Sequence, residues 1–371
     1  QTTTNNNKTT HRSQQPATNN KQITANCDLE HAEVGAPRAK QSWRTSVVVA
    51  QFQNDWPLLL TATAGAPNSH TGTGLCACIA ANRLSFAFDL RGQSLAVDTA
   101  CSSALVALKL GAGTLSQYGS AASSALVAAV NLLLWVSYAR AEALGAALLL
   151  PGVAPARGGG SPALAGVEVG SDGRSASLTA PRGPAQQAVI LGALSQAQAL
   201  SEELLECHGT GTPLGDPVEL AAAAKVLSPG LLLAGSAKAA LAHAEGAAGL
   251  VGLARLCAGL RAASDLSSTR WLAMPMPHLR AANPHLAAGR GMHNNDNNNN
   301  YNNNINNKNN KSNTNNKHDT GAEAESDRQP LLPCESVALP SQAPTAVAGV
   351  SSFGFGGTNA HAVLRAPSTP R

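Results

Sequence analysis

One cysteine occupies a sequence setting that suits nucleophilic chemistry. Cys101 follows the short apolar run Leu95-Ala96-Val97 and precedes the small-residue stretch Ala104 to Leu115, so a strand should give way to a helix near the sulfur. At the first turn of a helix, unsatisfied backbone amides and the positive end of the helix dipole favour a thiolate. The alternative for a cysteine in an alanine-rich chain is a buried, inert thiol.

Two histidines lie beside flexible or small-residue segments. His208 enters the loop Gly209 to Pro213, and His243 lies shortly after Lys238, just before the stretch Ala244 to Leu260. Taken alone, each histidine is more often a core or surface residue than a catalytic one. Neutral imidazoles can nevertheless hold an oxyanion through their N–H groups, which makes the pair a candidate for such chemistry.

The glycine-rich segment Phe353 to Asn359 offers exposed backbone amides that could also stabilise an oxyanion. Turns of this kind are equally common where they only join two strands. A third segment, at Asp216, Pro217 and Glu219, predicts the start of a helix, with Asp216 as the N-cap and Glu219 completing a capping-box-like pattern.

Short apolar runs alternate with small-residue helices along the chain, which is typical of an α/β fold. Besides the strand and helix around Cys101, the expected elements are helices over 188–200 and 244–260 and strands over 204–207, 231–235, 346–350 and 360–364. These elements must bring the candidate residues together, because the residues are far apart in the sequence.

Composition excludes several classes of protein. The 371 residues are only 13% charged, with a formal net charge of +4, so we expect neither nucleic-acid binding nor a membrane-surface patch. The longest apolar stretch, 125–136, is too short for a bilayer, which needs roughly 20 residues. The first residues lack the apolar segment of a secretory signal, and we expect a cytoplasmic location.

The seven cysteines argue against a disulfide framework, because their number is odd and their spacing irregular. Cys76 and Cys78 form a C-x-C pair without the second pair that a zinc site would need. We therefore expect no metal site. The thiols should occupy a reducing compartment.

Two segments differ in composition from the rest. Residues 1–45 are rich in Thr, Asn and Gln, and residues 293–330 are dominated by Asn; both should be disordered, since neither can bury enough apolar surface. Between them lies a domain over 46–365, which we divide into an N-terminal half of about 46–180 and a C-terminal half of about 181–365. The Asn-rich segment would be an insertion in the second half.

Four motifs occur in the order found in β-ketoacyl synthases: VDTACSSALVAL (97–108), ECHGTGTPLGDPVE (206–219), GSAKAALAHAEGAAGLVGL (235–253) and GVSSFGFGGTNAHAVL (349–364). The chain resembles the ketosynthase domain of type I polyketide synthases and animal-type fatty acid synthases. The resemblance runs from about Val47 to Leu364, apart from the Asn-rich insertion. Together the four motifs are highly specific.

The resemblance implies an α/β, thiolase-like fold with two similar βαβαβαββ halves in stacked layers, and a homodimer. Compared with the family, the stretch before Val47 lacks the usual opening strand, and the segment between Asn131 and Asp172 is shortened. We therefore expect a fold that is truncated at its N-terminus and that has lost or moved one core strand in the middle.

The resemblance also implies the reaction, a decarboxylative Claisen condensation of an acyl chain with a malonyl-type unit. Cys101 would carry the acyl chain as a thioester, while His208 and His243 would promote decarboxylation and stabilise the enolate. The amides of Cys101 and Phe355 would form the oxyanion hole, Phe355 would gate the acyl pocket, and Lys238 would orient the histidines electrostatically. The supporting residues in the matching motifs are Asn359, Asp216 and Glu219.

The implied partner is an acyl carrier protein, whose phosphopantetheine arm delivers the substrates, and no cofactor is needed. Two other functions compete with this one. A catalytically silent ketosynthase-like scaffold, or a fragment of a multidomain synthase, would fit the altered N-terminus and middle. Thiolase or chalcone-synthase-like chemistry on free CoA thioesters is disfavoured, because those enzymes lack the HGTGT and GFGGTNAH loops present here.

Overall fold

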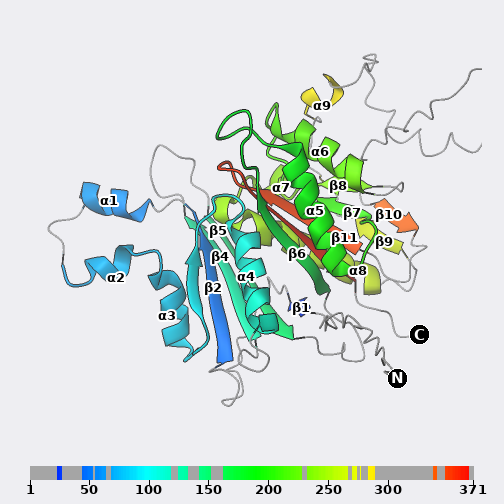
Figure 1. Cartoon of the computed structure of the whole chain (residues 1–371). Coiled ribbons are helices and arrows are strands. Elements are labelled where there is room, and N and C mark those ends of the chain that lie inside the picture. The colour runs from blue at the N-terminus through cyan, green and yellow to red at the C-terminus, as the bar shows by residue number, and fades with distance from the viewer. Residues whose placement is uncertain are drawn as a thin grey trace, which may run out of the picture.

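A mixed sheet of ten strands, counted over the described residues, forms the frame of the protein (Figure 1). The computed structural model describes residues 23–26, 44–52, 55–63, 68–117, 124–132, 142–151, 162–227, 232–265, 270–273, 276, 283–288, 337–340 and 347–366. The strand order is β3-β2-β4-β5-β1-β6-β12-β11-β7-β8, and β9 pairs with β10 separately. The Asn-rich segment 293–330 lies outside the described residues.

The strands are β1 (Ile23–Asn26), β2 (Thr45–Gln51), β3 (Ser94–Val97), β4 (Ser124–Leu132), β5 (Glu142–Pro151), β6 (Ala163–Ser171), β7 (Leu204–Glu206), β8 (Leu233–Gly235), β9 (Arg270–Ala273), β10 (Val337–Pro340), β11 (Val347–Phe353) and β12 (Thr358–Arg365). The helices are α1 (Trp56–Thr63), α2 (Thr71–Leu75), α3 (Ile79–Ala87), α4 (Ser103–Gln117), α5 (Gly183–Ala197), α6 (Gly215–Val226), α7 (Lys238–Leu241), α8 (Ala248–Asp265) and α9 (His285–Ala288). A 3₁₀ turn, η2 (Glu245–Ala247), leads directly into α8.

The sheet contains the same arrangement twice. In the first half β2 pairs parallel with β3 and β4, and β4 pairs antiparallel with β5. In the second half β7 pairs parallel with β8 and β11, and β11 pairs antiparallel with β12. In each half a long helix, α4 or α8, follows the edge strand. With β6 and α5, the second half shows the full expected βαβαβαββ order.

The segment between Asn131 and Asp172 contains two strands of the main sheet. Strand β5 pairs with β4 from Ala125↔Leu149 to Leu132↔Glu142, and β6 pairs with β12. Of the two expected alternatives, a core strand lost or moved, the loss is not what the structure shows, because both strands are present here. The sequence EALGAALLLP lacks β-branched residues and clear alternation, so its pattern did not distinguish a buried strand from a helix.

Strand β1 lies within the segment 1–45, for which we expected no structure. It pairs antiparallel with β5 on one side and with β6 on the other. The first half of the sheet is thereby joined to the second. The other residues of the segment before Arg44 lie outside the described part of the chain.

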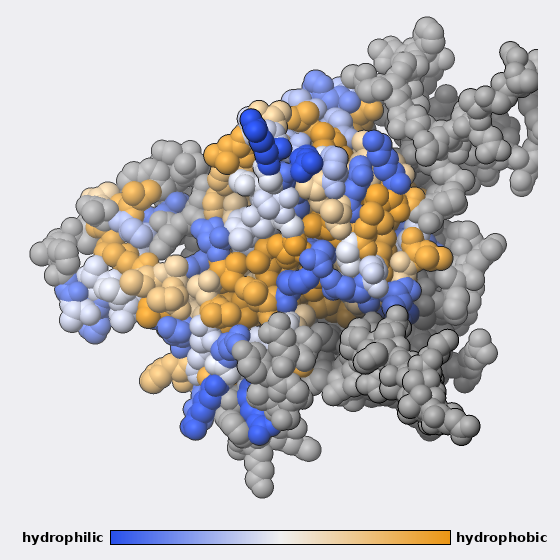
Figure 2. Space-filling view, viewed as in Figure 1, coloured by the Kyte–Doolittle hydropathy of each residue, from blue (hydrophilic) through white to orange (hydrophobic). Residues whose placement is uncertain are grey.

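The core is built mainly from alanine, leucine and valine. Helices α4 and α8 pack against each other and against the sheet, and the side chains of Leu105, Leu108, Leu253 and Leu260 are fully buried between them and the strands. Figure 2 shows a band of apolar residues on the face where α4 and α5 lie. None of the described helices has both the length and the apolar character needed to span a bilayer.

The crossing of α4 and α8 depends on a glycine. A Cβ atom added to Gly249 would lie 2.7 Å from Cγ of Leu105 and 3.2 Å from its backbone nitrogen. Contacts this short cannot be relieved by a small side-chain movement, because one of the two atoms is backbone. Gly249 therefore permits the close approach that joins the two halves.

We expect Gly249→Ala to lower the free energy of unfolding by about 1 to 3 kcal/mol, because it overpacks this crossing. Gly113→Ala is the matched control: a Cβ at this glycine of α4 meets nothing within 4 Å, so the higher helix propensity of alanine should raise stability by up to about 1 kcal/mol. Urea denaturation measures both. Equal effects of the two substitutions would contradict the packing argument.

Candidate active site

The structure brings Cys101, His208 and His243 together although they are distant in the sequence. One ligand atom from each, the sulfur and one ring nitrogen per histidine, lies within 4.8 Å of the others. Nε2 of His243 is 3.1 Å from Sγ of Cys101, and the two imidazole rings meet edge to face with centroids 5.6 Å apart. The predicted convergence of these residues is thus present in the structure.

The fold explains this convergence. Cys101 lies just before α4 and His243 just before η2 and α8, so they occupy equivalent positions in the two halves. His208 follows β7, next to the edge strand β8 of the second half. The site therefore lies where the two halves meet, and neither half contains all three side chains.

The hydrogen bonding of His243 selects one tautomer. The backbone N–H of Glu245 donates to Nδ1 of His243 at 3.1 Å, so in the neutral ring the proton resides on Nε2. This N–H points at the sulfur of Cys101. Burial, with the nearby charge of Lys238, lowers the pKa of His243 to about 4. His243 is therefore a neutral N–H donor at pH 7.

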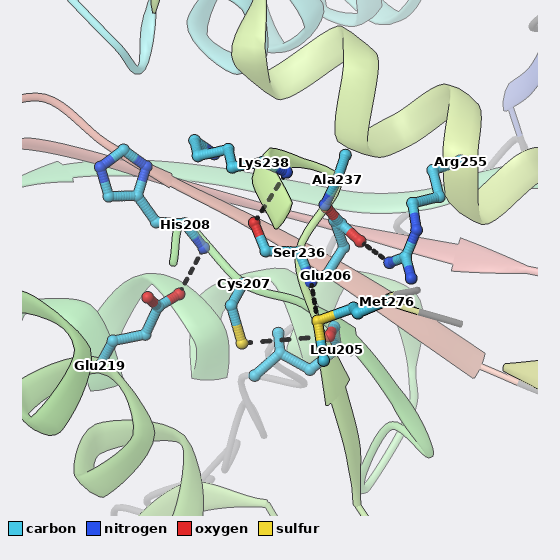
Figure 3. A network of polar contacts seen from close by, with 10 residues as sticks. All are labelled: Leu205, Glu206, Cys207, His208, Glu219, Ser236, Ala237, Lys238, Arg255 and Met276. Atoms are coloured by element: carbon cyan, nitrogen blue, oxygen red, sulfur yellow. Dashed lines mark hydrogen bonds and ion pairs between the residues drawn. The ribbon is translucent and has the colours of Figure 1, made fainter. Parts of the chain in front are cut away.

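His208 is held by a buried carboxylate. Its backbone N–H donates to Oε1 of Glu219 at 2.6 Å (Figure 3). The N–H of Gly209 donates to Oε2 of the same side chain at 2.9 Å. The ring packs against Phe353, with centroids 5.7 Å apart. Burial, then Lys238 and His243, place the pKa of His208 well below its usual value, while burial raises that of Glu219 to about 7.

The capping prediction for the helix at Asp216 is wrong. Helix α6 begins at Gly215, and its N-cap residue is Leu214, which makes no side-chain cap. The Asp216 carboxylate instead accepts hydrogen bonds from the Gly211 amide at 3.1 Å and from Nδ2 of Asn283 at 3.0 Å. The loop after His208 has backbone donors that need acceptors, and both acidic side chains of α6 serve that loop.

Lys238 begins α7 and extends toward His208 in Figure 3. Burial lowers its pKa, and its charge contributes to the lowered pKa values of both histidines. Behind it, the buried Glu206 accepts hydrogen bonds from the Ala237 amide at 2.5 Å and from Arg255. This ion pair fixes the turn between β8 and α7 that carries Lys238.

Phe355 and Asn359 take different positions from the three central residues. The ring of Phe355 is 59% exposed and lies 5.9 Å from that of Phe52. Asn359 is buried and donates to Asp172 at 2.8 Å, so it holds β12 against the end of β6. Within the described part of the chain, no hydrogen bond joins Asn359 to Cys101, His208 or His243.

The cysteine differs from the sequence-based expectation. Burial and the carboxylate of Glu245, whose Oε2 lies 3.7 Å from the sulfur, raise the pKa of Cys101 to about 12. The expected direction, toward the thiolate, is therefore wrong for the substrate-free protein. The sequence reasoning missed Glu245, although it is the sole acidic residue between Glu219 and Asp265 and lies two positions after His243.

A sulfur and two imidazoles are also a ligand set for a soft metal ion. The tautomer of His243 does not suit that role, because its Nε2 carries the proton and has no free lone pair. Metal-binding histidines normally donate from the other ring nitrogen, whereas Nδ1 of His243 accepts. The geometry fits an N–H donor to an oxyanion better than a metal ligand.

A cavity of about 610 Å³ adjoins the site. Its lining includes His243 and Lys238, the loop 209–211, Met276 and Asn283. The lining is mixed, because it holds the charged or titratable groups Asp216, Glu219 and Lys238 together with apolar groups such as Leu220 and Leu286.

Ala242, immediately before His243, has φ 58° and ψ −170°, a backbone conformation occupied almost only by glycine. We expect Ala242→Gly to raise the free energy of unfolding by about 1 kcal/mol, since relief of strain outweighs the added freedom of the unfolded chain. Ala240→Gly, within α7, should lower it. Thermal denaturation distinguishes the two variants. A loss of stability in both would contradict the claim that the backbone at Ala242 is strained.

Glu245→Gln should lower the pKa of Cys101, because it removes the negative charge that favours the thiol over the thiolate. The rate of iodoacetamide labelling at Cys101, followed by mass spectrometry against pH, should rise at lower pH than in the parent. The control is Glu168→Gln, because the Glu168 carboxylate pairs with Lys109 instead of Cys101; it should leave the labelling midpoint unchanged. An unchanged or higher midpoint in Glu245→Gln would be incompatible with this electrostatic role.

Comparison with known proteins places this geometry in a family. Residues 22–149 match the model of the β-ketoacyl synthase N-terminal domain, and residues 163–264 match that of the C-terminal domain. Together they cover more than half of the chain. The matches divide between residues 149 and 163, whereas we placed the division between the halves at about residue 180, a boundary that stays a prediction.

Curated relatives include the polyketide synthase ThaG of Burkholderia thailandensis, 32% identical over 375 residues. Another is the hybrid PKS-NRPS synthetase iliA of a Neonectria species, 33% identical over 359 residues. These matches include 90% and 86% of this chain but only 6% and 8% of the relatives. The chain thus spans a small part of the length of the proteins it matches.

Solved ketosynthases share the fold. The ketosynthase from module 6 of the bacillaene synthase of Bacillus subtilis 168 superposes with a TM-score of 0.64 at 22% identity, covering 89% of this chain and 53% of that one. The oxazolomycin ketosynthase domain OzmH KS8 of Streptomyces albus JA3453 gives 0.60 at 28% identity, covering 89% and 76%. The fold is therefore thiolase-like, and the chain belongs to the β-ketoacyl synthase family.

Proposed function

We propose that this domain catalyses a decarboxylative Claisen condensation between an acyl chain bound to Cys101 and a malonyl-type unit on an acyl carrier protein. The observation that carries the proposal is the convergence of Sγ of Cys101 with the ring nitrogens of His208 and His243. Family membership supports it, because these three side chains come from motifs that resemble those of condensing enzymes. The enzyme would be an acyltransferase of the 3-oxoacyl synthase type.

In the first half-reaction, the sulfur of Cys101 attacks the carbonyl carbon of an incoming acyl thioester. The thiol proton passes to Glu245, whose carboxylate lies 3.7 Å from Sγ. The departing carrier thiolate then takes this proton from Glu245, which restores the carboxylate. His243 donates its Nε2–H toward the sulfur and so stabilises the thiolate as it forms. Exchange of one thioester for another costs little energy.

In the second half-reaction, the N–H groups of His208 and His243 hold the thioester oxygen of the malonyl unit. Carbon dioxide leaves, and the electron pair of the broken bond forms an enolate on that oxygen. The enolate carbon attacks the acyl carbonyl on Cys101, a carbon–carbon bond forms, and the Cys101 thiolate departs. The low pKa values of both histidines keep them neutral, so they stabilise the enolate without protonating its carbon.

The substrates would arrive on the phosphopantetheine arm of the carrier protein, and the chemistry needs neither a metal nor a redox cofactor. The cavity that reaches His243 and Lys238 offers space beside the histidines for part of the substrate. In this scheme burial keeps the histidines neutral, and the charge of Lys238 adds to that effect. The amides of Cys101 and Phe355 would serve as the oxyanion hole for the acyl carbonyl, with Phe355 at the pocket entrance.

A homodimer is part of the proposal. Strand β3 is an edge of the main sheet, and an edge strand can pair with another chain through its free backbone groups. Large apolar side chains flank this edge: Leu95, Phe86 and Phe88 are 39%, 91% and 43% exposed. Antiparallel pairing of β3 with the same strand of a second copy would cover them about a two-fold axis.

Leu95→Lys should convert such a dimer to a monomer, because it places a charge in the interface core. Light scattering after size-exclusion chromatography measures the mass. Leu191→Lys, at an exposed position of α5, is the control and should leave the mass unchanged. A parent protein that is monomeric at micromolar concentration would exclude the dimer.

The two half-reactions should separate by mutation. Cys101→Ala should abolish acyl loading but leave decarboxylation of a malonyl carrier measurable, because the histidines remain. His243→Ala should reduce decarboxylation by about a hundredfold, the usual effect of losing one oxyanion donor, while some loading persists. Radiolabelled acyl transfer and carbon dioxide release measure the two steps. The control is Cys257→Ala, at a buried position of α8, which should leave both steps intact. A folded parent that shows neither reaction with any carrier or CoA donor would support a silent scaffold instead.

A further inference from the structure

The turn that presents Cys101 is held largely by serine hydroxyls. Ala100, which precedes the cysteine, has φ 57°. This is the left-handed backbone region, which residues other than glycine rarely adopt. Three successive carbonyls of the turn each accept a hydrogen bond from a serine: Thr99 from Ser102 at 2.8 Å, Ala100 from Ser103 at 2.6 Å, and Cys101 from Ser352 at 2.7 Å.

The third serine differs from the others in its origin. Ser102 and Ser103 belong to the turn itself, whereas Ser352 lies on β11, 251 residues away in the sequence and in the other half of the fold. It is 1% exposed. A Cβ at Gly354, two residues further on, would lie 2.5 Å from the Thr99 carbonyl oxygen, so the end of β11 packs directly on the turn.

We propose that Ser352 is a positioning residue for the nucleophile: by donating to the carbonyl of Cys101, it fixes the cysteine backbone so that Sγ faces His243. This deepens the proposed function and rests on it. The carbonyl defines the peptide plane that follows Cys101, and a tilt of that plane moves Cβ and therefore the sulfur. The 3.1 Å contact with His243 and the 3.7 Å contact with Glu245 depend on that placement.

The neighbouring serine provides a matched control. Ser351 is also on β11 and also buried, but its hydroxyl bonds to Nδ1 of His361 at 2.9 Å, and Nε2 of His361 lies 3.1 Å from Glu202. Removing either hydroxyl takes one hydrogen bond from the same strand. Only the loss of Ser352 should affect the cysteine.

The test compares Ser352→Ala, Ser352→Thr and Ser351→Ala in the full chain. We expect Ser352→Ala to reduce the maximal rate of acyl loading by about ten- to a hundredfold, as for other small misplacements of a reacting group, with little change in KM for the acyl donor. Iodoacetamide labelling of Cys101 should slow in the same variant. Ser352→Thr should recover most of the rate, and Ser351→Ala should stay within about twofold of the parent even where its melting temperature falls.

Labelling requires no acyl substrate, so it separates this inference from the proposed function. A parent that never condenses, but whose Cys101 labelling still depends on Ser352, would reject the condensation and support the positioning role. Equal labelling and loading in Ser352→Ala and Ser351→Ala, or an effect on KM alone, would overturn the positioning role. Should Ser352→Ala not fold, Ser352→Cys keeps a weaker donor, and the same comparison applies.

Discussion

The contact between α4 and α8 is the constraint on which the site depends. Each helix follows the edge strand of its own half, and the two can approach because Gly249 presents no side chain to Leu105. Cys101 precedes one helix and His243 precedes the other, so the packing of two apolar helices sets the distance between sulfur and imidazole. The geometry of the site is therefore a consequence of how the core packs.

Burial at this junction also sets the protonation states. The same desolvation raises the pKa of Cys101 and lowers those of His208 and His243, because it disfavours charge of either sign. The result is a neutral thiol facing neutral imidazoles. In the proposed reaction, charge would develop only when a thioester carbonyl or a malonyl oxygen comes to lie among these donors.

Two acidic side chains beside this neutral centre, Glu206 and Glu219, both have partners. Glu206 pairs with Arg255 beneath the turn of Lys238, and Glu219 accepts two backbone amides next to His208. A buried charge without such partners would destabilise the fold by several kcal/mol. These carboxylates hold the loops that carry His208 and Lys238, and the charge of Lys238 adds to the effect of burial in keeping the histidines unprotonated.

The sequence by itself determined much of this protein. Local patterns predicted the strand before Cys101, the helix after it, the hairpin of β11 and β12, and, through the four motifs, the family and the three central residues. Only the tertiary structure decided how the halves pair, that residues 142–151 form strand β5, that Asp216 and Glu219 serve the His208 loop, and that Glu245 faces the sulfur. The physical reason is range. Periodicity and turn chemistry depend on neighbours in the chain, whereas strand partners, burial and pKa values depend on residues that lie far apart in the sequence, as Ser352 and Cys101 do at 251 positions.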